Sequence, residues 1–301
     1  MSSKYEFIDG EKLTVDEDGN PKYTIGSMCR WLLVSGSGFY EWLSRPESAT
    51  SQRRHRLALV VTKAFDDSDG TYGYRRLHAQ LARWGQHCSP ELVRNLMRSL
   101  GLVACQPRPW RHNLTESGPS GPIPDLVARD FTAERPGIKM VGDITYIATW
   151  QGWLFLATVI DCHTKAVIGW ATGDNYKTPL ISAAIAMAVR NHDLQPGAIF
   201  HSDRGSNYTS AEFAAMLAEH NLRQSVGRTG ICYDNAMAES FFAALKNELV
   251  HRTVYPTREH ARKDVVRYIE LRYNTRRLHS GLDYKTPQEV HNAYFDQQSK
   301  A

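Results

Sequence analysis

The sequence predicts an α/β protein with a mixed five-stranded sheet flanked by helices, preceded by an all-α segment. Two observations lead to this fold class. Residues 51–105 show only helix-type spacing of apolar residues. From Lys139 onward, three strand-like segments come first, and helices then alternate with two further short strands in the order βββαβαβα. This order is typical of a sheet that carries helices on both faces.

The N-terminal part, residues 1–50, is expected to consist of an arm and short helices. Residues 1–23 have no sustained apolar period, which predicts a loosely packed arm. Apolar residues cluster between Met28 and Leu43, and the sequence SGSG divides them. We therefore expect two short helices joined by a turn.

Residues 51–105 are predicted to form a helix-turn-helix-like, DNA-binding domain. Helical spacing begins at Ser51, stops at DDSDGTYG and resumes over 74–84. Ser89-Pro90 suits the cap and first turn of a further helix, which we expect to end at Gly101. A plain helical hairpin would give the same pattern, so these features alone leave both alternatives open.

The arginines of this segment are candidates for contacts with DNA. The final helix would present Arg94 and Arg98, as the second helix of a helix-turn-helix does in the major groove. Arg75 and Arg76 lie on the outward side of the preceding helix. The surface of an ordinary solvated helix is the alternative explanation.

Residues 106–128 are predicted to be a linker, because 106–124 are rich in Pro, Gly and Ser. Residues 129–255 carry the α/β pattern. The expected strands are Met140–Thr149, Gly152–Asp161, Ala166–Thr172, Ala198–Ser202 and Asn221–Val226. The expected helices are Thr178–Asn191, Thr209–His220 and Asp234–Val250.

Residues 256–301 are predicted to be a basic, helical C-terminal segment. Thr257 would cap a long helix that reaches about Asn274, and Pro287–Tyr294 would form a last short helix. Arg276 and Arg277 lie between them and are further candidates for contacts with DNA.

Composition supports a polyanionic partner without identifying it. The net charge of the 301 residues is only +4, but 51–112 contain eleven Lys/Arg against four Asp/Glu, and 251–285 contain nine against four. No apolar run approaches the ~20 residues of a membrane helix, and the polar N-terminus is unlike a signal peptide. The five cysteines form no CxxC pair, so we expect reduced thiols and a cytoplasmic location.

Three carboxylates are candidates for a shared metal site. Asp143 lies in a strand, Asp203 follows the end of another strand, and Glu239 lies on a helix with 35 residues between it and Asp203. Lys246 comes seven positions after Glu239, which places both on one helix face. Phosphodiester cleavage or transfer can use two divalent ions held by such carboxylates. Each residue also has an ordinary structural role open to it, as a turn residue, a cap or a surface ion pair.

The sequence around these residues resembles that of a known family. VGDITYI, VIDCHTKAVIGWA, FHSDRGSNY and DNAMAESFFAALKNE are similar to the catalytic core of insertion-sequence transposases, most strongly the IS3 family and its second-reading-frame product. TYGYRRLHAQL and LVRNLMRSLGL resemble its helix-turn-helix-like segment, and RYNTRRLHSGLDYKTPQEV resembles its C-terminal run. The resemblance covers roughly 35–294.

The resemblance implies an RNase H-like fold of the integrase type and a catalytic triad of Asp143, Asp203 and Glu239. It implies Mg²⁺ or Mn²⁺ as cofactor, with two ions per site when DNA is bound. The activity would be cleavage at the inverted-repeat ends of a bacterial element, followed by transfer of the freed 3′-OH into target DNA. We expect a homo-oligomer, at least a dimer, on DNA. Because the family enzyme is usually a frameshift fusion, the upstream-frame protein is a further expected partner.

Two other functions stay open at this point. One is a DNA-binding regulator with a vestigial acidic site, and the presence of all three carboxylates and Lys246 disfavours it. The other is an RNase H-type nuclease that acts on RNA–DNA hybrids. The helix-turn-helix-like segment and the flanking basic segments favour duplex DNA ends instead.

Overall fold

The structure is a computed structural model that describes residues 2–105, 123–227 and 235–299. It divides into two compact units, residues 1–60 and 61–301. Most of the predicted linker lies outside the described residues, and the division of the chain into five parts stays a prediction. None of the described helices has the length and apolar character that crossing a bilayer requires.

The first unit contains a small helical core. Its helices are α1 (Ser2–Glu11), α2 (Ile25–Trp31) and α3 (Gly36–Ser44). Tyr5 and Ile8 are three residues apart on α1, and both are buried in a cluster with Met28, Cys29 and Phe39. The expectation of a loosely packed arm over 1–23 is therefore wrong for the α1 part. Two apolar residues on one helix face, without a longer period, are enough to hold this helix in place.

The helices at the start of the second unit agree closely with those predicted from the sequence. Its helices are α4 (Ala49–Asp67), which contains the boundary between the units, α5 (Tyr74–Arg83) and α6 (Pro90–Ser99). The Ser89 hydroxyl accepts the hydrogen bond of the Leu92 amide at 3.2 Å, so the predicted cap is confirmed. Leu77 and Leu81 of α5 are buried, as are Val93, Leu96 and Met97 of α6.

A mixed five-stranded sheet forms the centre of the second unit, as predicted. Its strands are β1 (Lys139–Thr149), β2 (Gly152–Asp161), β3 (Val167–Gly173), β4 (Ile199–Ser202) and β5 (Arg223–Val226). The order is β3-β2-β1-β4-β5. The first three strands form the expected antiparallel meander, and β4 and β5 add in parallel to β1.

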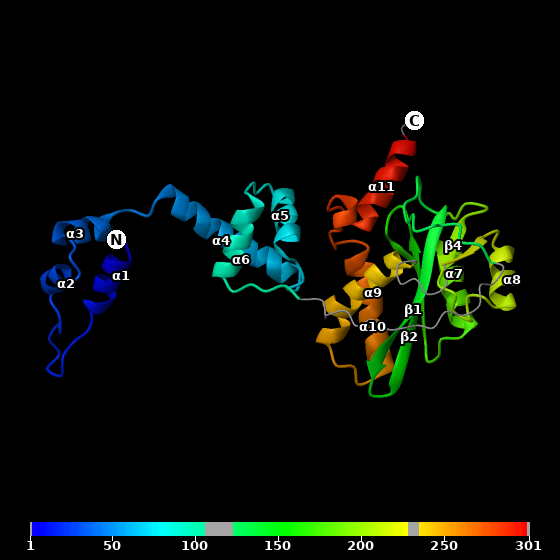
Figure 1. The fold of residues 1–301 in the computed structure, drawn as a ribbon, viewed down its shortest axis with the longest axis horizontal. Helices are drawn as coiled ribbons and strands as arrows, with labels where there is room; N and C mark the ends of the chain where they lie inside the picture. Colours follow the sequence, from blue (N-terminus) through cyan, green and yellow to red (C-terminus); the bar gives the residue numbers. More distant parts are fainter. Residues whose placement is uncertain (1, 106–122, 228–234, 300–301) are drawn as a thin grey trace. The chain divides into compact units, whose positions relative to one another are not determined.

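Helices cover both faces of this sheet (Figure 1). One face packs against α7 (Thr178–Asn191) and α8 (Ala211–Glu219), and the other against α9 (Ala236–Glu248) and α10 (Arg258–Tyr268). Each face has its own buried apolar cluster. On the α9 face, Ala238, Phe241, Phe242 and Leu245 are buried as their helical spacing predicts, which fixes the rotation of α9 on the sheet.

The C-terminal segment continues from α10 and is more irregular than predicted. A 3₁₀ turn (Val250–Arg252) follows α9, and Thr257 caps α10 through the amide of His260 at 3.1 Å. The helix passes into a π-helical turn (Ile269–Tyr273) instead of continuing regularly to about Asn274. A short 3₁₀ turn (Ser280–Leu282) and α11 (Pro287–Gln298) complete the segment.

Candidate active site

The register of two neighbouring strands brings Asp143 and Asp203 to corresponding positions. Val141 of β1 pairs with His201 of β4 in parallel, and each aspartate lies two residues beyond its member of that pair. Adjacent strands lie about 4.8 Å apart. The two aspartates therefore stand side by side where β4 ends and β1 continues.

A hydrogen bond ties the start of α9, and with it Glu239, to the same place. The Asn235 side-chain amide donates to the carbonyl oxygen of Gly142, the residue before Asp143, at 3.2 Å. Asn235 holds the cap position of α9, but its side chain makes no capping hydrogen bond. The Asn235 side chain thus binds the strand instead of capping α9.

The charges of Asp203 and Glu239 act on the buried carboxyl group of Asp143. Burial and the negative charges of Asp203 and Glu239 raise the pKa of Asp143 to about 8, against smaller lowering effects from the Ile144 amide and Lys246. Asp143 keeps some exposed surface, but protein atoms surround its carboxyl group. Burial alone raises the pKa of Glu239.

Lys246 lies on the same side of α9, within reach of the acidic group. Burial lowers its pKa, and the charge of Asp143 opposes that shift. Its Nζ atom lies 5.1 Å from the centre of the Tyr146 ring, and Tyr146 is itself half exposed. Ala243, between Glu239 and Lys246, is exposed, so the small residue leaves the helix surface open there.

The donor set fits a hard divalent cation. Carboxylate oxygens are the ligands that Mg²⁺ and Mn²⁺ prefer. Asp203 is exposed, so the site is open on one side. Among the described residues, no three His, Cys, Asp or Glu side chains already stand in a complete metal-binding arrangement.

Two buried polar atoms beside the carboxylates were missed by sequence reasoning. The Tyr208 hydroxyl and Asn235 Oδ1 have no hydrogen-bond partner among the described residues. Burial and the charges of Asp143 and Asp203 raise the pKa of Tyr208, so its hydroxyl lies within their electrostatic reach. An unpaired buried polar atom costs free energy and is rare unless something else binds it. The only sequence signal was the position of Tyr208 at the end of FHSDRGSNY.

Two other buried polar residues of the sheet have structural roles. Asp161 accepts hydrogen bonds with its carboxylate from the Gly137 amide at 2.9 Å and from the Thr164 amide and hydroxyl, each at 2.7 Å. His201 bonds to the Ser225 hydroxyl at 2.8 Å. Both side chains are therefore held in contacts within the fold.

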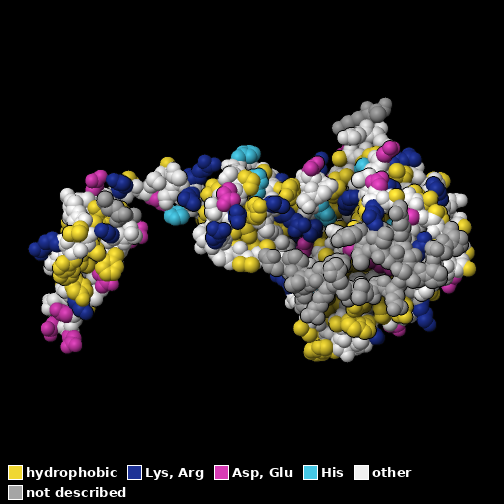
Figure 2. All heavy atoms as spheres, viewed as in Figure 1, with side chains coloured by type: hydrophobic (Ala, Val, Ile, Leu, Met, Phe, Trp, Pro, Cys, Tyr) yellow, Lys and Arg dark blue, Asp and Glu magenta, His cyan; other side chains and the backbone are white. Residues whose placement is uncertain are grey.

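The predicted DNA-binding arginines fall into two groups. Four of them are exposed: Arg75, Arg94, Arg98 and Arg276. The other two are engaged inside the protein. Arg277 is only 8% exposed and forms an ion pair with Glu248 at 2.7 Å, and Arg76 lies 3.8 Å from the same carboxylate. Figure 2 shows Lys and Arg side chains over the segment that carries α4 to α6.

Comparisons with protein families match both parts of the second unit. An HTH-like domain family matches residues 52–110. Two integrase core domain families match residues 133–232 and 220–287.

Among solved structures, the chain is similar to retroviral integrase cores. The HTLV-2 integrase catalytic core domain in complex with magnesium is 15% identical, with a TM-score of 0.42 over 52% of this chain and 98% of that one. The BIV integrase catalytic core domain is 14% identical, with a TM-score of 0.41 over 54% and 99%.

Similarity to curated relatives extends over nearly the whole chain. An insertion element IS600 protein of 31 kDa from Shigella sonnei is 35% identical over 89% of this chain and 98% of that protein. The transposase InsF for insertion sequence IS3A from Escherichia coli is 37% identical over 96% of this chain and 98% of that protein. With this identity at almost full length on both sides, the chain belongs to the IS3 family of insertion-sequence transposases.

Proposed function

We propose that Asp143, Asp203 and Glu239 are the catalytic residues of this transposase and together hold Mg²⁺ or Mn²⁺, two ions when DNA is bound. The observation that carries the proposal is the raised pKa of Asp143, caused by its burial and by the charges of the other two carboxylates. A buried cluster of acidic groups is unfavourable by itself and becomes favourable when cations bind it. When bound, the metal supplies neutralisation of phosphate charge and activation of the attacking oxygen.

The three residues hold their carboxylates from elements of different rigidity. Asp143 is fixed in β1, between β2 and β4, and burial with the neighbouring negative charges raises the pKa of its carboxyl group to about 8. Asp203 lies at an exposed strand end, with Oδ1 accepting the Gly205 amide at 2.9 Å. Glu239 comes from the first turns of α9. We assign Lys246 to a phosphate of the DNA strand, because its long side chain lies beside the acidic group and carries the opposite charge.

The proposed reaction is 3′-end cleavage at the inverted repeats of an element, followed by strand transfer. Water first breaks a phosphodiester bond and leaves a 3′-OH. That oxygen then attacks a phosphorus atom of the target DNA, so one phosphodiester bond forms while another breaks. No covalent link to the protein is needed.

DNA contacts outside the acidic site are assigned to the exposed arginines of the helical and C-terminal segments, Arg75, Arg94, Arg98 and Arg276. Joining two element ends requires at least two copies of the chain on DNA. The upstream-frame protein is a further candidate partner, and the site of action would be the bacterial nucleoid. These roles follow the predicted division into arm, helix-turn-helix-like domain, linker, catalytic core and C-terminal segment.

The proposal is tested with labelled inverted-repeat ends and Mg²⁺. The wild-type protein should nick them at one position, and Asp203→Asn should abolish nicking. Asp174→Asn is the matched control, because Asp174 is an exposed aspartate outside the site. Binding without cleavage by the wild type would instead support a regulator with a vestigial site. Cleavage of an RNA–DNA hybrid alone would support an RNase H-type nuclease.

A further inference from the structure

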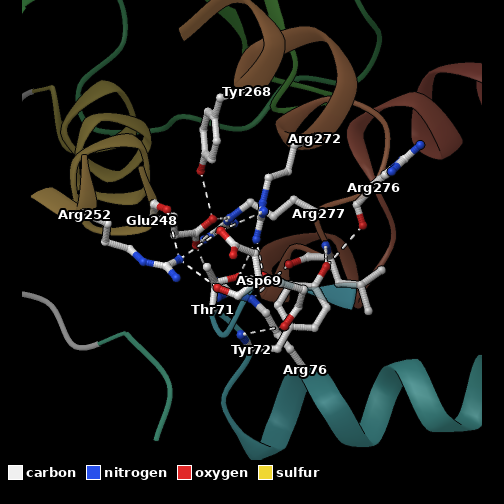
Figure 3. A network of polar contacts seen from close by, with 12 residues as sticks. Asp69, Thr71, Tyr72, Arg76, Glu248, Arg252, Tyr268, Arg272, Arg276 and Arg277 are labelled. Carbon is white, nitrogen blue, oxygen red and sulfur yellow. Dashed lines mark hydrogen bonds and ion pairs between the residues drawn. The ribbon is translucent and has the colours of Figure 1, made fainter. Parts of the chain in front are cut away.

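A second carboxylate of α9, Glu248, lies at the end of the helix opposite Glu239 and is buried, with 5% of its surface exposed. Two nitrogens of the Arg277 guanidinium donate hydrogen bonds to its carboxylate. Nη2 lies 2.7 Å from Oε1, and Nε lies 2.9 and 3.0 Å from the two oxygens. The Tyr268 hydroxyl donates to Oε2 at 2.9 Å. Figure 3 shows these side chains converging from α9, the end of α10 and the C-terminal segment.

Residues of the helix-turn-helix-like segment also contact Glu248 and the residues around Arg277. Arg76 of α5 places Nη1 3.8 Å from Glu248 Oε1 and donates from Nε to the Leu278 carbonyl at 3.0 Å. The Tyr72 hydroxyl accepts the Leu278 amide at 2.8 Å and donates to the Arg276 carbonyl at 3.2 Å. We call Glu248, Arg277, Tyr268, Arg76 and Tyr72 the Glu248 joint.

Further contacts around the joint connect the helix-turn-helix-like segment with the part of the chain that follows α9. Arg272 donates to the Thr71 hydroxyl at 2.9 Å, and Arg252 donates to the Asp69 carbonyl at 2.7 Å. On the far side of α5, Arg83 forms an ion pair with Glu289 of α11. The contacts of α5 with the C-terminal segment thus extend along the helix.

The arginines of α5 and α6 therefore differ in what they contact. The arginines of α5 at positions 76 and 83 are used to attach it to the C-terminal part of the chain. Those of α6, Arg94 and Arg98, are exposed. The buried joint lies about 13 Å from Glu239 along one straight helix, at 1.5 Å per residue. Helix α9 therefore contacts Arg76 of α5 near one end and carries Glu239 near the other.

We propose that the Glu248 joint is a positioning device, which holds the helix-turn-helix-like segment in fixed register with the acidic site and so sets which nucleotide of a bound DNA end reaches it. The inference rests on the proposed function. Arg76 of α5 shares the buried Glu248 carboxylate with Arg277 and also donates to the Leu278 carbonyl, so moving α5 away would cost both of its contacts. An attachment made only for stability would not need to meet the catalytic helix itself.

The test measures the position of DNA directly and needs no cleavage. A photoreactive benzoylphenylalanine replaces the exposed Ala243 of α9 in the full chain, and labelled inverted-repeat DNA is crosslinked to it. We expect crosslinks at one or two adjacent nucleotides. Arg76→Leu, which removes the α5 contacts to Glu248 and Leu278 but leaves Arg277 and Tyr268 on Glu248 and Arg83 on Glu289, should spread them over at least about five nucleotides.

Two comparison variants separate positioning from binding. Arg98→Ala should weaken DNA binding without spreading the crosslinks. Arg223→Leu changes an exposed arginine on β5 and should change neither. If Arg76→Leu fails to fold, Tyr72→Phe removes both hydrogen bonds of the hydroxyl, to the Arg276 carbonyl and from the Leu278 amide, and weakens the same contact while every ion pair stays in place. An unchanged crosslink pattern in a folded Arg76 or Tyr72 variant would overturn the inference.

Failure of the proposed function gives a different result. If the chain that carries only the photoreactive residue at 243 crosslinks at a defined position and Arg76→Leu spreads the crosslinks, but the wild-type chain does not nick the DNA in Mg²⁺, the catalytic proposal fails and the positioning proposal stands. If it nicks at one position and Arg76→Leu nicks at that same position with an unchanged crosslink pattern, the positioning proposal fails alone.

Discussion

Helix α9 carries a carboxylate near each end, and the two have opposite surroundings. Glu239 lies near Asp143, whose pKa is raised by burial and by the charges of Asp203 and Glu239. Glu248 is enclosed by Arg277, with the Tyr268 hydroxyl on its second oxygen. The first end lies among other acidic groups, and the second is paired with a buried cation. If the proposed function is right, the difference separates a site that binds a metal ion from a contact that holds the fold together.

Removing the acidic group at the first end should have the largest effect. Asp143→Asn keeps the shape of the side chain but removes a central negative charge. We expect DNA nicking to fall by at least about 10³-fold, because electrostatic stabilisation is usually the largest contribution to such catalysis. The rate of nicking of labelled element ends measures it. A loss of less than tenfold would contradict the assignment of Asp143.

The same carboxylate-to-amide change should act on stability with opposite signs at the two ends. Glu248→Gln leaves a buried guanidinium without its counter-charge and should cost about 3 kcal/mol of unfolding free energy. Asp143→Asn, without metal and at pH 7, should stabilise the protein, because it removes a carboxyl group whose ionisation the site opposes. Urea unfolding in the presence of EDTA measures both. If both variants lose stability, the claim that the two ends differ in sign is wrong.

The Glu248 end should also weaken in acid, through His279. Burial and the charges of Arg277 and Arg76 lower the pKa of His279 to about 3. The unfolded chain therefore binds a proton near pH 6.5 that the folded protein binds only near pH 3. Above pH 6.5, His279 is neutral in both states and does not lower the free energy of unfolding. As the pH falls below 6.5, the unfolded chain gains the proton first, so the free energy of unfolding decreases, by about 2 kcal/mol at pH 5.

The contribution of His279 is isolated by comparing wild type with His279→Gln between pH 5 and 7. Asp143 acts in the opposite direction over the same range in metal-free protein, so only the difference between the two proteins is informative. The variant should lose less stability than the wild type on acidification. Parallel curves would show that His279 protonates freely in the folded protein.

The smallest expected effect concerns the unpaired hydroxyl of Tyr208. Tyr208→Phe removes a buried polar atom without a partner, so the unfolding free energy should rise by about 1 kcal/mol. Nicking should fall by less than tenfold, since the hydroxyl lies within electrostatic reach of Asp143 and Asp203 without holding either. Thermal unfolding and the nicking rate measure the two effects. A loss of stability would mean that the hydroxyl has a partner in solution.

Local sequence patterns predicted most of the fold. The bounds of β1, β2 and α7 agree with the expected segments to within one residue, because alternation and helical spacing mark them clearly. Ser89 is the cap that its sequence context predicted. The helix α1 was missed because its inward residues are too few to form a period.

Contacts between distant charges could not be predicted in the same way. Glu248 and Arg76 are 172 residues apart, and arginines in a basic segment look like surface residues in the sequence. One signal was present. Glu248 follows Ala238, Phe241 and Leu245 at helical spacing, which places it on the buried face of α9. A carboxylate there requires a buried cation, and only the fold identifies it as Arg277.

The central claim is that Asp143, Asp203 and Glu239 share a divalent cation. Crystals of the protein with a bound DNA end and Mn²⁺ test it most directly, since anomalous scattering locates manganese without reference to activity. The account predicts a manganese peak within about 2.2 Å of oxygens from Asp143 and Asp203, with Glu239 completing the site, and its absence in Asp203→Asn. Manganese bound elsewhere, with the three carboxylates still apart beside the DNA, would contradict it.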